Sequence, residues 1–195
     1  FYREIKGIGA MLQISQAGMA CGTVLADLLT GKLVPSGHLT STWAKKYMDY
    51  PASKTFCDNS SNDKTYDEGI FVGYRYFDSF EIEPAYPFGY GKSYTEFSWE
   101  FKGIELKDET LSVRVEVTNC GKSHGGKEVI QVYTSSPNGS LVQPYQELRA
   151  FAKTKLLSPG ESQALTLEWN VRDMASYDES KAEKVNKAKI TAKRL

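Results

Sequence analysis

The second half of the chain alternates apolar and polar residues, and this period of two constrains the fold more than any other feature of the sequence. Leu or Val occupies every second position from 111 to 117, with Ser, Arg and Glu between them. Similar runs follow over 128–133, 148–153 and 165–169, and residues that favour turns separate them. Short alternating strands between turns are typical of an antiparallel β-sandwich. We therefore predict a separate all-β domain over residues 97–180.

The first forty residues are typical of the end of an α/β unit. The apolar run at 9–15 suits a buried strand as well as a helical segment. Between positions 19 and 29 apolar residues recur every four positions, which predicts a helix that Gly31 ends. Residues 35–37 are Pro, Ser and Gly and predict a turn. One strand and one helix cannot form a packed layer, so we expect the rest of the sheet to come from polypeptide outside this chain.

Aromatic residues are concentrated between positions 66 and 101, where 13 of them lie. On an extended chain, Ile70 and Tyr74 would share one face, while Phe71 and Phe77 would share the other. A segment that is apolar on both faces must be covered on both sides, which indicates a strap between two domains. A platform of aromatic rings for sugars or bases is the alternative interpretation.

The same segment contains acidic residues, so we considered a glycosidase site. Such a site needs two carboxyl groups about 5 to 9.5 Å apart. Asp67 and Glu68 are adjacent and would point to opposite faces of a strand, so they cannot form this pair by themselves. Glu68 and Arg75 are candidates for the rim of a substrate cleft whose other residues lie elsewhere. The structural alternative is that Glu68 caps backbone amides or pairs with Arg75, whose planar guanidinium suits an organised contact.

Composition argues against several other classes of function. Lys plus Arg and Asp plus Glu each number 24, so no net field draws the chain to a nucleic acid or an anionic membrane. The apolar runs are too short to cross a bilayer. Three cysteines without paired spacing argue against a disulfide framework, and two distant histidines, His38 and His124, argue against a metal site. We expect no cofactor, no metal, no nucleic-acid partner and no membrane partner.

The last residues are basic. Residues 181–194 hold six Lys or Arg and one Glu, a composition typical of a frayed, solvated end. Ala188, Ile190 and Ala192 alternate with lysines, which would also suit a charged edge strand. We predict a frayed tail and keep the edge strand as the alternative.

Four blocks of the sequence are distinctive when they are taken together. They are ADLLTGKLVPSGHLTSTW (26–43), YDEGIFVGYRYFDSFEIEPAYPFGYGKSYTEF (66–97), VEVTNCGKSHGGKEVIQVY (115–133) and QELRAFAKTKLLSPGES (146–162). In this order they resemble glycoside hydrolase family 3, whose best-known members are the β-glucosidases. The chain departs from the family pattern in two places. Ala17 stands where the family has a Glu, and the tail after position 178 replaces an aromatic-rich closing strand, which would leave an edge exposed.

The resemblance implies an α+β fold, in which the remnant of an α/β sandwich layer precedes an all-β, fibronectin type III-like (immunoglobulin-like) sandwich. It also implies that the catalytic Asp lies on a separate barrel domain and that the acid/base Glu, in many members, lies earlier in the α/β sandwich domain. Neither motif is present here, so no residue of this chain is assigned a catalytic role. The implied partners are the missing barrel domain, in the same parent chain or a separate one, and an oligosaccharide or glycoside substrate bound through the parent.

We therefore expect four regions along the chain. They are the end of an α/β sandwich domain with an exposed loop at 47–64 (1–65), an aromatic connecting strap (66–96), the fibronectin type III-like sandwich (97–180) and a basic tail (181–195). The chain lacks both an initial Met and a basic-then-apolar leader, so we expect a mature, processed or excised polypeptide.

The expected function is that of a C-terminal scaffold in a retaining β-glucosidase-type hydrolase. A stand-alone carbohydrate-binding or interaction module is the alternative, and it requires an exposed row of aromatic residues. The candidates for that row are Tyr133, Tyr145 and Trp169. A third possibility is the inactive product of a defective gene.

Overall fold

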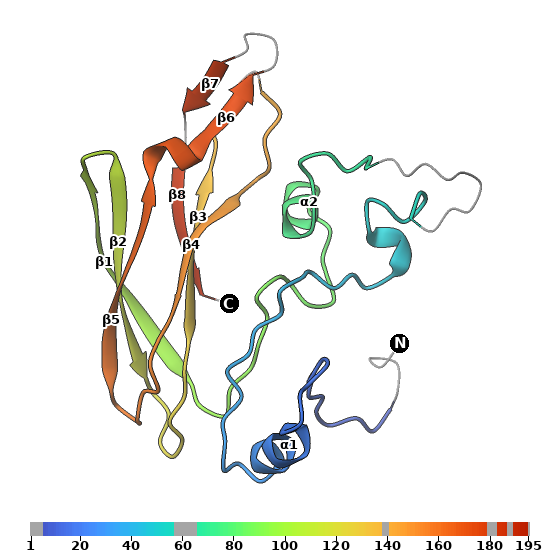
Figure 1. Ribbon diagram of the computed structural model, residues 1–195, viewed down its shortest axis with the longest axis vertical. Coiled ribbons are helices and arrows are strands. Elements are labelled where there is room, and N and C mark those ends of the chain that lie inside the picture. The colour runs from blue at the N-terminus through green and yellow to red at the C-terminus, as the bar shows by residue number, and fades with distance from the viewer. Residues whose placement is uncertain (1–5, 57–65, 138–140, 179–182, 187–188, 195) are drawn as a thin grey trace. The chain divides into compact units, whose positions relative to one another are not determined.

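The computed structural model describes residues 6–56, 66–137, 141–178, 183–186 and 189–194, with side chains described up to position 177 (Figure 1). The chain divides into two compact units, Phe1–Val34 and Pro35–Leu195. Among the described residues, the first unit contains one helix, and the second contains the β-sandwich and the strap. The expected α+β class, with few helices and antiparallel sheets, is confirmed.

The first unit contains helix α1, Cys21–Leu29. It ends as predicted, because Thr30 caps it and Gly31 takes a left-handed conformation with φ of 74°. No residue of α1 is buried. The run at 9–15 forms neither of the two elements that we considered, and its apolar side chains are largely exposed. A strand needs a hydrogen-bonded neighbour, and none pairs with this run among the described residues.

The described residues of the second unit form two three-stranded antiparallel sheets and a small hairpin. The first sheet has the order β1 (Phe97–Lys107), β2 (Thr110–Asn119), β5 (Ser162–Asn170). The second has the order β4 (Glu147–Lys153), β3 (Val129–Ser135), β8 (Lys189–Arg194), and β6 (Ala175–Asp178) pairs with β7 (Glu183–Asn186). Helix α2 (Tyr74–Ser79) and the 3-10 helices η2 (Tyr47–Asp49) and η3 (Val171–Met174) also lie in this unit.

The core lies between the two sheets, where the period of two placed it. The alternating apolar residues of β2 and β5 are buried, as are both faces of β3. The cluster consists of Phe97, Leu111, Val113, Val115, Val117, Ile130, Val132, Leu157, Leu165, Leu167 and Trp169. Burying each such aliphatic side chain contributes about 1.5 to 3 kcal/mol, so this cluster is the main source of stability of the sandwich.

A buried asparagine fixes the end of β2. The Asn119 amide donates to the carbonyl oxygens of His124 and Leu157, each at 2.9 Å, and its Oδ1 accepts from the Thr95 hydroxyl at 2.6 Å. Gly121 must be a glycine, because a Cβ there would lie 1.8 Å from the Thr95 hydroxyl. This network ties the end of the strap to the first sheet, since every polar group of the buried amide is used.

Two sequence predictions outside the core are wrong. Residues 35–37 do not form the predicted turn. The chain after them runs beside the end of the strap: the Leu39 N–H donates to the Tyr90 carbonyl at 2.9 Å, and Trp43 and Tyr86 form an antiparallel bridge. The backbone groups of Leu39 and Trp43 therefore find their hydrogen-bond partners in a distant segment of the chain.

The frayed-tail prediction is also wrong, and the edge-strand alternative is correct. β8 pairs antiparallel with β3, with Ala192 opposite Val132 and Thr191 opposite Tyr133. Pairing with a central strand supplies backbone partners that outweigh the repulsion among basic residues. The predicted exposed loop at 47–64 contains η2 and turns up to position 56, while residues 57–65 lie outside the described part.

Candidate functional site

Residues 74–79 of the strap form a helix rather than part of the extended segment that we predicted. Gly73 precedes α2 with φ of 58° and ψ of −131°, a conformation open mainly to glycine, and its carbonyl accepts the N–H groups of Tyr76 and Phe77. Phe77 is buried, and its ring lies edge-on to Tyr50 at 5.8 Å. The helix changes which residues share a face: Tyr74 and Asp78 now lie one turn apart.

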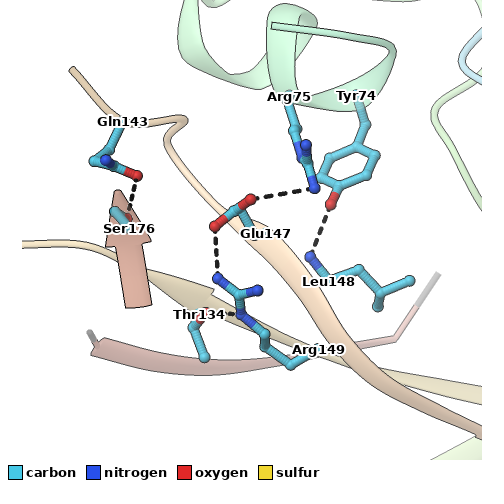
Figure 2. A network of polar contacts seen from close by, with 8 residues as sticks. All are labelled: Tyr74, Arg75, Thr134, Gln143, Glu147, Leu148, Arg149 and Ser176. Atoms are coloured by element: carbon cyan, nitrogen blue, oxygen red, sulfur yellow. Dashed lines mark hydrogen bonds and ion pairs between the residues drawn. The ribbon is translucent and has the colours of Figure 1, made fainter. Parts of the chain in front are cut away.

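Helix α2 covers the open edge of β4, which is the terminal strand of its sheet. The Leu148 N–H donates to the Tyr74 hydroxyl at 2.7 Å (Figure 2). The Tyr145 N–H donates to the Ser79 hydroxyl at 2.9 Å. The Gln146 amide donates to the Asp78 carboxylate. Side chains from the strap thus satisfy groups that an edge strand otherwise exposes.

An ionic chain runs from α2 across the second sheet (Figure 2). Arg75 Nη2 lies 3.1 Å from one oxygen of Glu147, and Arg149 Nη2 lies 2.5 Å from the other. Arg149 also donates to the Thr134 hydroxyl of β3 at 2.8 Å. The carboxylate is bracketed by two guanidinium groups, so both of its oxygens are occupied by structural contacts.

Tyrosine rings fill the space beneath these polar contacts. The Tyr74 ring lies edge-on to Tyr133 of β3 at 5.6 Å and beside Phe88 at 5.1 Å. Tyr133 is buried, and its hydroxyl donates to Gln131. Burial raises the pKa of the Tyr133 phenol well above its usual value, with smaller contributions from Tyr74 and Asp78. The aromatic residues therefore act mainly as packing between strap and sheet.

A second contact joins the segment after position 35 to the same sheet. The Lys153 ammonium donates to the Ser36 carbonyl at 2.5 Å. Burial lowers the pKa of Lys153, and the positive charge of the nearby Lys127 lowers it further. His38 Nε2 lies 3.5 Å from a carboxylate oxygen of Glu128, the residue just before β3. The strap and this segment both lie against β3 and β4.

The two residues proposed for a cleft rim have different partners in the structure. Arg75 faces Glu147 in the network above. Glu68 is half-buried in the turn before α2, where its backbone carbonyl accepts the Phe71 N–H at 2.9 Å. Their role at a rim stays a prediction.

Sequence reasoning missed most of the contact itself. It did not single out Asp78, Ser79, Gln146, Glu147 or Arg149. Glu147 and Arg149 are two positions apart on one strand and so share a face, which was the one available signal. Their partners on α2 could not be found, because the helix was not predicted.

The described part of the chain offers little else for chemistry. It holds no group of three or more His, Cys, Asp or Glu residues suited to a metal ion. None of its helices has the length and apolar character to span a membrane. A small polar depression beside the ionic chain contains one carboxylate, Glu147, and so lacks the facing pair of a glycosidase.

The fold and the contact between α2 and β4 define a class of protein. Such a protein has an α/β fragment, followed by a strap that packs against a fibronectin type III-like sandwich. Residues 128–192 match the model of the fibronectin type III-like domain, and residues 3–74 match that of the glycosyl hydrolase family 3 C-terminal domain. The chain belongs to glycoside hydrolase family 3 and corresponds to the C-terminal part of its β-glucosidases.

Individual relatives agree with this assignment. The chain is 41% identical over 177 residues to a β-glucosidase of Rhizobium radiobacter and 44% identical over 172 residues to one of Ruminococcus albus. These alignments cover 88% of this chain and 21% and 18% of the relatives. The chain therefore spans about a fifth of the length of the curated relatives that it matches.

Solved structures give the same result. The chain resembles β-glucosidase 3B from Thermotoga neapolitana in complex with glucose, with a TM-score of 0.78 and 46% identity over 84% of this chain and 23% of that one. A β-glucosidase from Kluyveromyces marxianus in complex with glucose has a TM-score of 0.81 and 33% identity, over 88% and 21% of the two chains. The resemblance that the sequence blocks indicated is confirmed.

Proposed function

We propose that this chain is the C-terminal scaffold of a retaining β-glucosidase-type hydrolase and carries no catalytic residue of its own. The parent protein cleaves terminal β-linked sugars through a glycosyl-enzyme intermediate, without a metal or a cofactor. The nucleophile and the acid/base come from the rest of the parent, including a barrel domain in the same chain or a separate one. The relatives named above are β-glucosidases and are about four to five times longer than their match to this chain, which supports this proposal.

The observation that carries the proposal is how the polar groups of the aromatic segment are used. Tyr74, Arg75 and Asp78 contact the backbone and side chains of β4 and the residues just before it. Such contacts hold two parts of a protein at a fixed angle, which a scaffold requires. We keep Glu68 and Arg75 as rim residues of a cleft that the rest of the parent completes.

The first test is hydrolysis of an aryl β-glucoside by the isolated chain. We expect no turnover, because the described residues bring no two carboxylates together across a pocket. Turnover that follows the chain through purification and is lost in Glu68→Gln would contradict the scaffold proposal.

The second test is complementation. A Ruminococcus albus β-glucosidase truncated to remove the region that matches this chain should be inactive alone, and adding this chain should restore activity. A chain that carries Val115→Asp serves as the control, because it cannot form the sandwich core. Equal activity with and without the added chain would show that the region is not a required scaffold.

The alternative of a carbohydrate-binding module loses its predicted platform. Tyr133 and Trp169 are buried, and only Tyr145 of the three candidates is exposed. Titration of the whole chain with cello-oligosaccharides tests this alternative directly: the scaffold proposal expects no saturable binding.

A further inference from the structure

One side of the sandwich leaves core-facing side chains open to solvent. Four apolar residues of β1 lie opposite four core residues of β2, so both sets project from the same face of the sheet. The pairs are Trp99 with Val117, Phe101 with Val115, Ile104 with Val113, and Leu106 with Leu111. The β2 residues are 0 to 8% exposed, whereas those of β1 are 36, 51, 46 and 63% exposed. The second sheet therefore covers β2 and leaves β1 uncovered.

The second sheet also ends on the side of the sandwich where β1 lies. β4 and β5 adjoin at one side of the sandwich, so β1 and β8 are the terminal strands at the other (Figure 1). In the described part of the chain, β8 pairs with β3 alone. Its other edge presents backbone N–H and C=O groups to any strand that approaches. One strand added there, about 4.8 Å from β8, would extend the second sheet over the β1 row.

We propose that the β1 row and the free edge of β8 form an acceptor site for one further β-strand, supplied by polypeptide outside residues 1–195. The row is continuous with the core through Phe97, which lies on the same strand and is buried. Its members, the Gly103 bulge aside, recur at every second position, which matches the side-chain period of an incoming strand. This inference stands on the sandwich alone and does not depend on the proposed catalytic parent.

The chemistry of the site selects a peptide. The row consists of Trp, Phe, Ile and Leu, and a sugar site needs convergent polar groups as well as aromatic faces. Backbone hydrogen bonds to β8 would supply affinity, and the apolar row would read alternate side chains. β8 contains Lys189, Lys193 and Arg194, so acidic residues between the apolar ones would complement its charge.

The test uses two synthetic peptides and the whole chain. The first peptide, about nine residues long to span the row, has Val at alternate positions with Thr or Glu between them. The second has the same composition with its valines consecutive. We expect saturable calorimetric binding of the alternating peptide, about tenfold or more tighter than that of its control, with amide exchange protection confined to β1 and β8.

Variants of the chain locate the site. Phe101→Glu should weaken binding of the alternating peptide by about tenfold or more, because it places a charge in the row. Lys107→Glu introduces the same residue near the end of the same strand, and it should change affinity by less than about twofold. If Phe101→Glu does not fold, the comparison of the two peptides on the unchanged chain still decides the matter.

Three results would overturn the proposal. They are equal affinity for the two peptides, saturable binding of cello-oligosaccharides that the alternating peptide displaces, and a stable dimer by sedimentation that Phe101→Glu dissociates. The second would assign the row to sugars, and the third would assign it to a second copy of this chain.

Discussion

Helix α1 and strand β2 are both strongly amphipathic in sequence, yet they differ completely in burial. α1 repeats apolar residues every four positions and has no buried residue, whereas β2 repeats them every two and buries its whole apolar face. A periodic pattern makes one face of an element apolar, but only an opposing layer removes that face from water. The second sheet supplies the opposing layer for β2. The described residues of the first unit supply no such layer for α1.

The largest expected effect comes from introducing the same charge into the two elements. Val115→Asp buries an unpaired carboxylate in β2 and should cost about 4 kcal/mol or more, which unfolds the sandwich. Val24→Asp places the carboxylate on the half-exposed face of α1 and should change stability by less than about 0.5 kcal/mol. Chemical denaturation followed by tryptophan fluorescence measures both.

That comparison fails if the two substitutions have similar effects. A large loss of stability in Val24→Asp would mean that α1 is packed against a partner in solution, and size-exclusion chromatography of the unchanged chain would then show an assembly.

A smaller effect is expected where the strap meets the second sheet. Glu147→Gln removes the charge between Arg75 and Arg149 and should lower the free energy of unfolding by about 1 to 2 kcal/mol. The matched control is Glu105→Gln, which breaks an exposed pair with Arg114 and should cost less than about 0.5 kcal/mol. Equal costs would show that the ionic chain holds the strap no better than a surface pair.

Removing one hydroxyl group tests the cover over the edge of β4. Tyr74→Phe keeps the ring against Tyr133 and loses the acceptor for the Leu148 N–H, so it should cost about 1 kcal/mol. Amide exchange at Leu148 should become faster in the variant. An unchanged exchange rate would mean that the hydrogen bond does not protect this edge.

The smallest expected effect is a dependence on alkaline pH. The pKa of Tyr133 is raised in the folded state, so the native protein keeps a proton that the unfolded chain loses above pH 10. The stabilisation is complete well below pH 10 and declines as pH rises through the unfolded-state pKa, by about 0.7 kcal/mol between pH 9.5 and 10.5. Tyr133→Phe should remove this part of the slope, and an identical slope in thermal melts of the two proteins would contradict the assignment.

The accuracy of the sequence predictions follows the range of the interactions involved. The buried rows of β2 and β5 and the helix α1 were predicted correctly, because a short-range repeat specifies them. The strap was predicted as extended, and its helix depends on a positive φ at Gly73 and on contacts with β4. β8 was judged a frayed tail because composition cannot show that β3 offers a free edge.

The candidate contact was predictable only in outline. The density of aromatic residues indicated a strap that packs against other parts of the chain. In the structure, Tyr74 and Phe77 of the strap make packing contacts with Tyr133 and Tyr50. Glu147 and Arg149 lie about seventy positions farther along the chain than α2, so no local pattern linked them to Arg75. The fold determines which distant segments form salt bridges, and no repeating pattern in the sequence predicts these pairs.

The sequence by itself determined which faces of this protein are apolar and which family its blocks belong to. Only the tertiary structure decided which of those faces are covered: β2 is closed off, while β1 and α1 are left open. The physical reason is that side-chain alternation is a property of one segment, whereas burial requires a second surface that long-range pairing alone can bring into place.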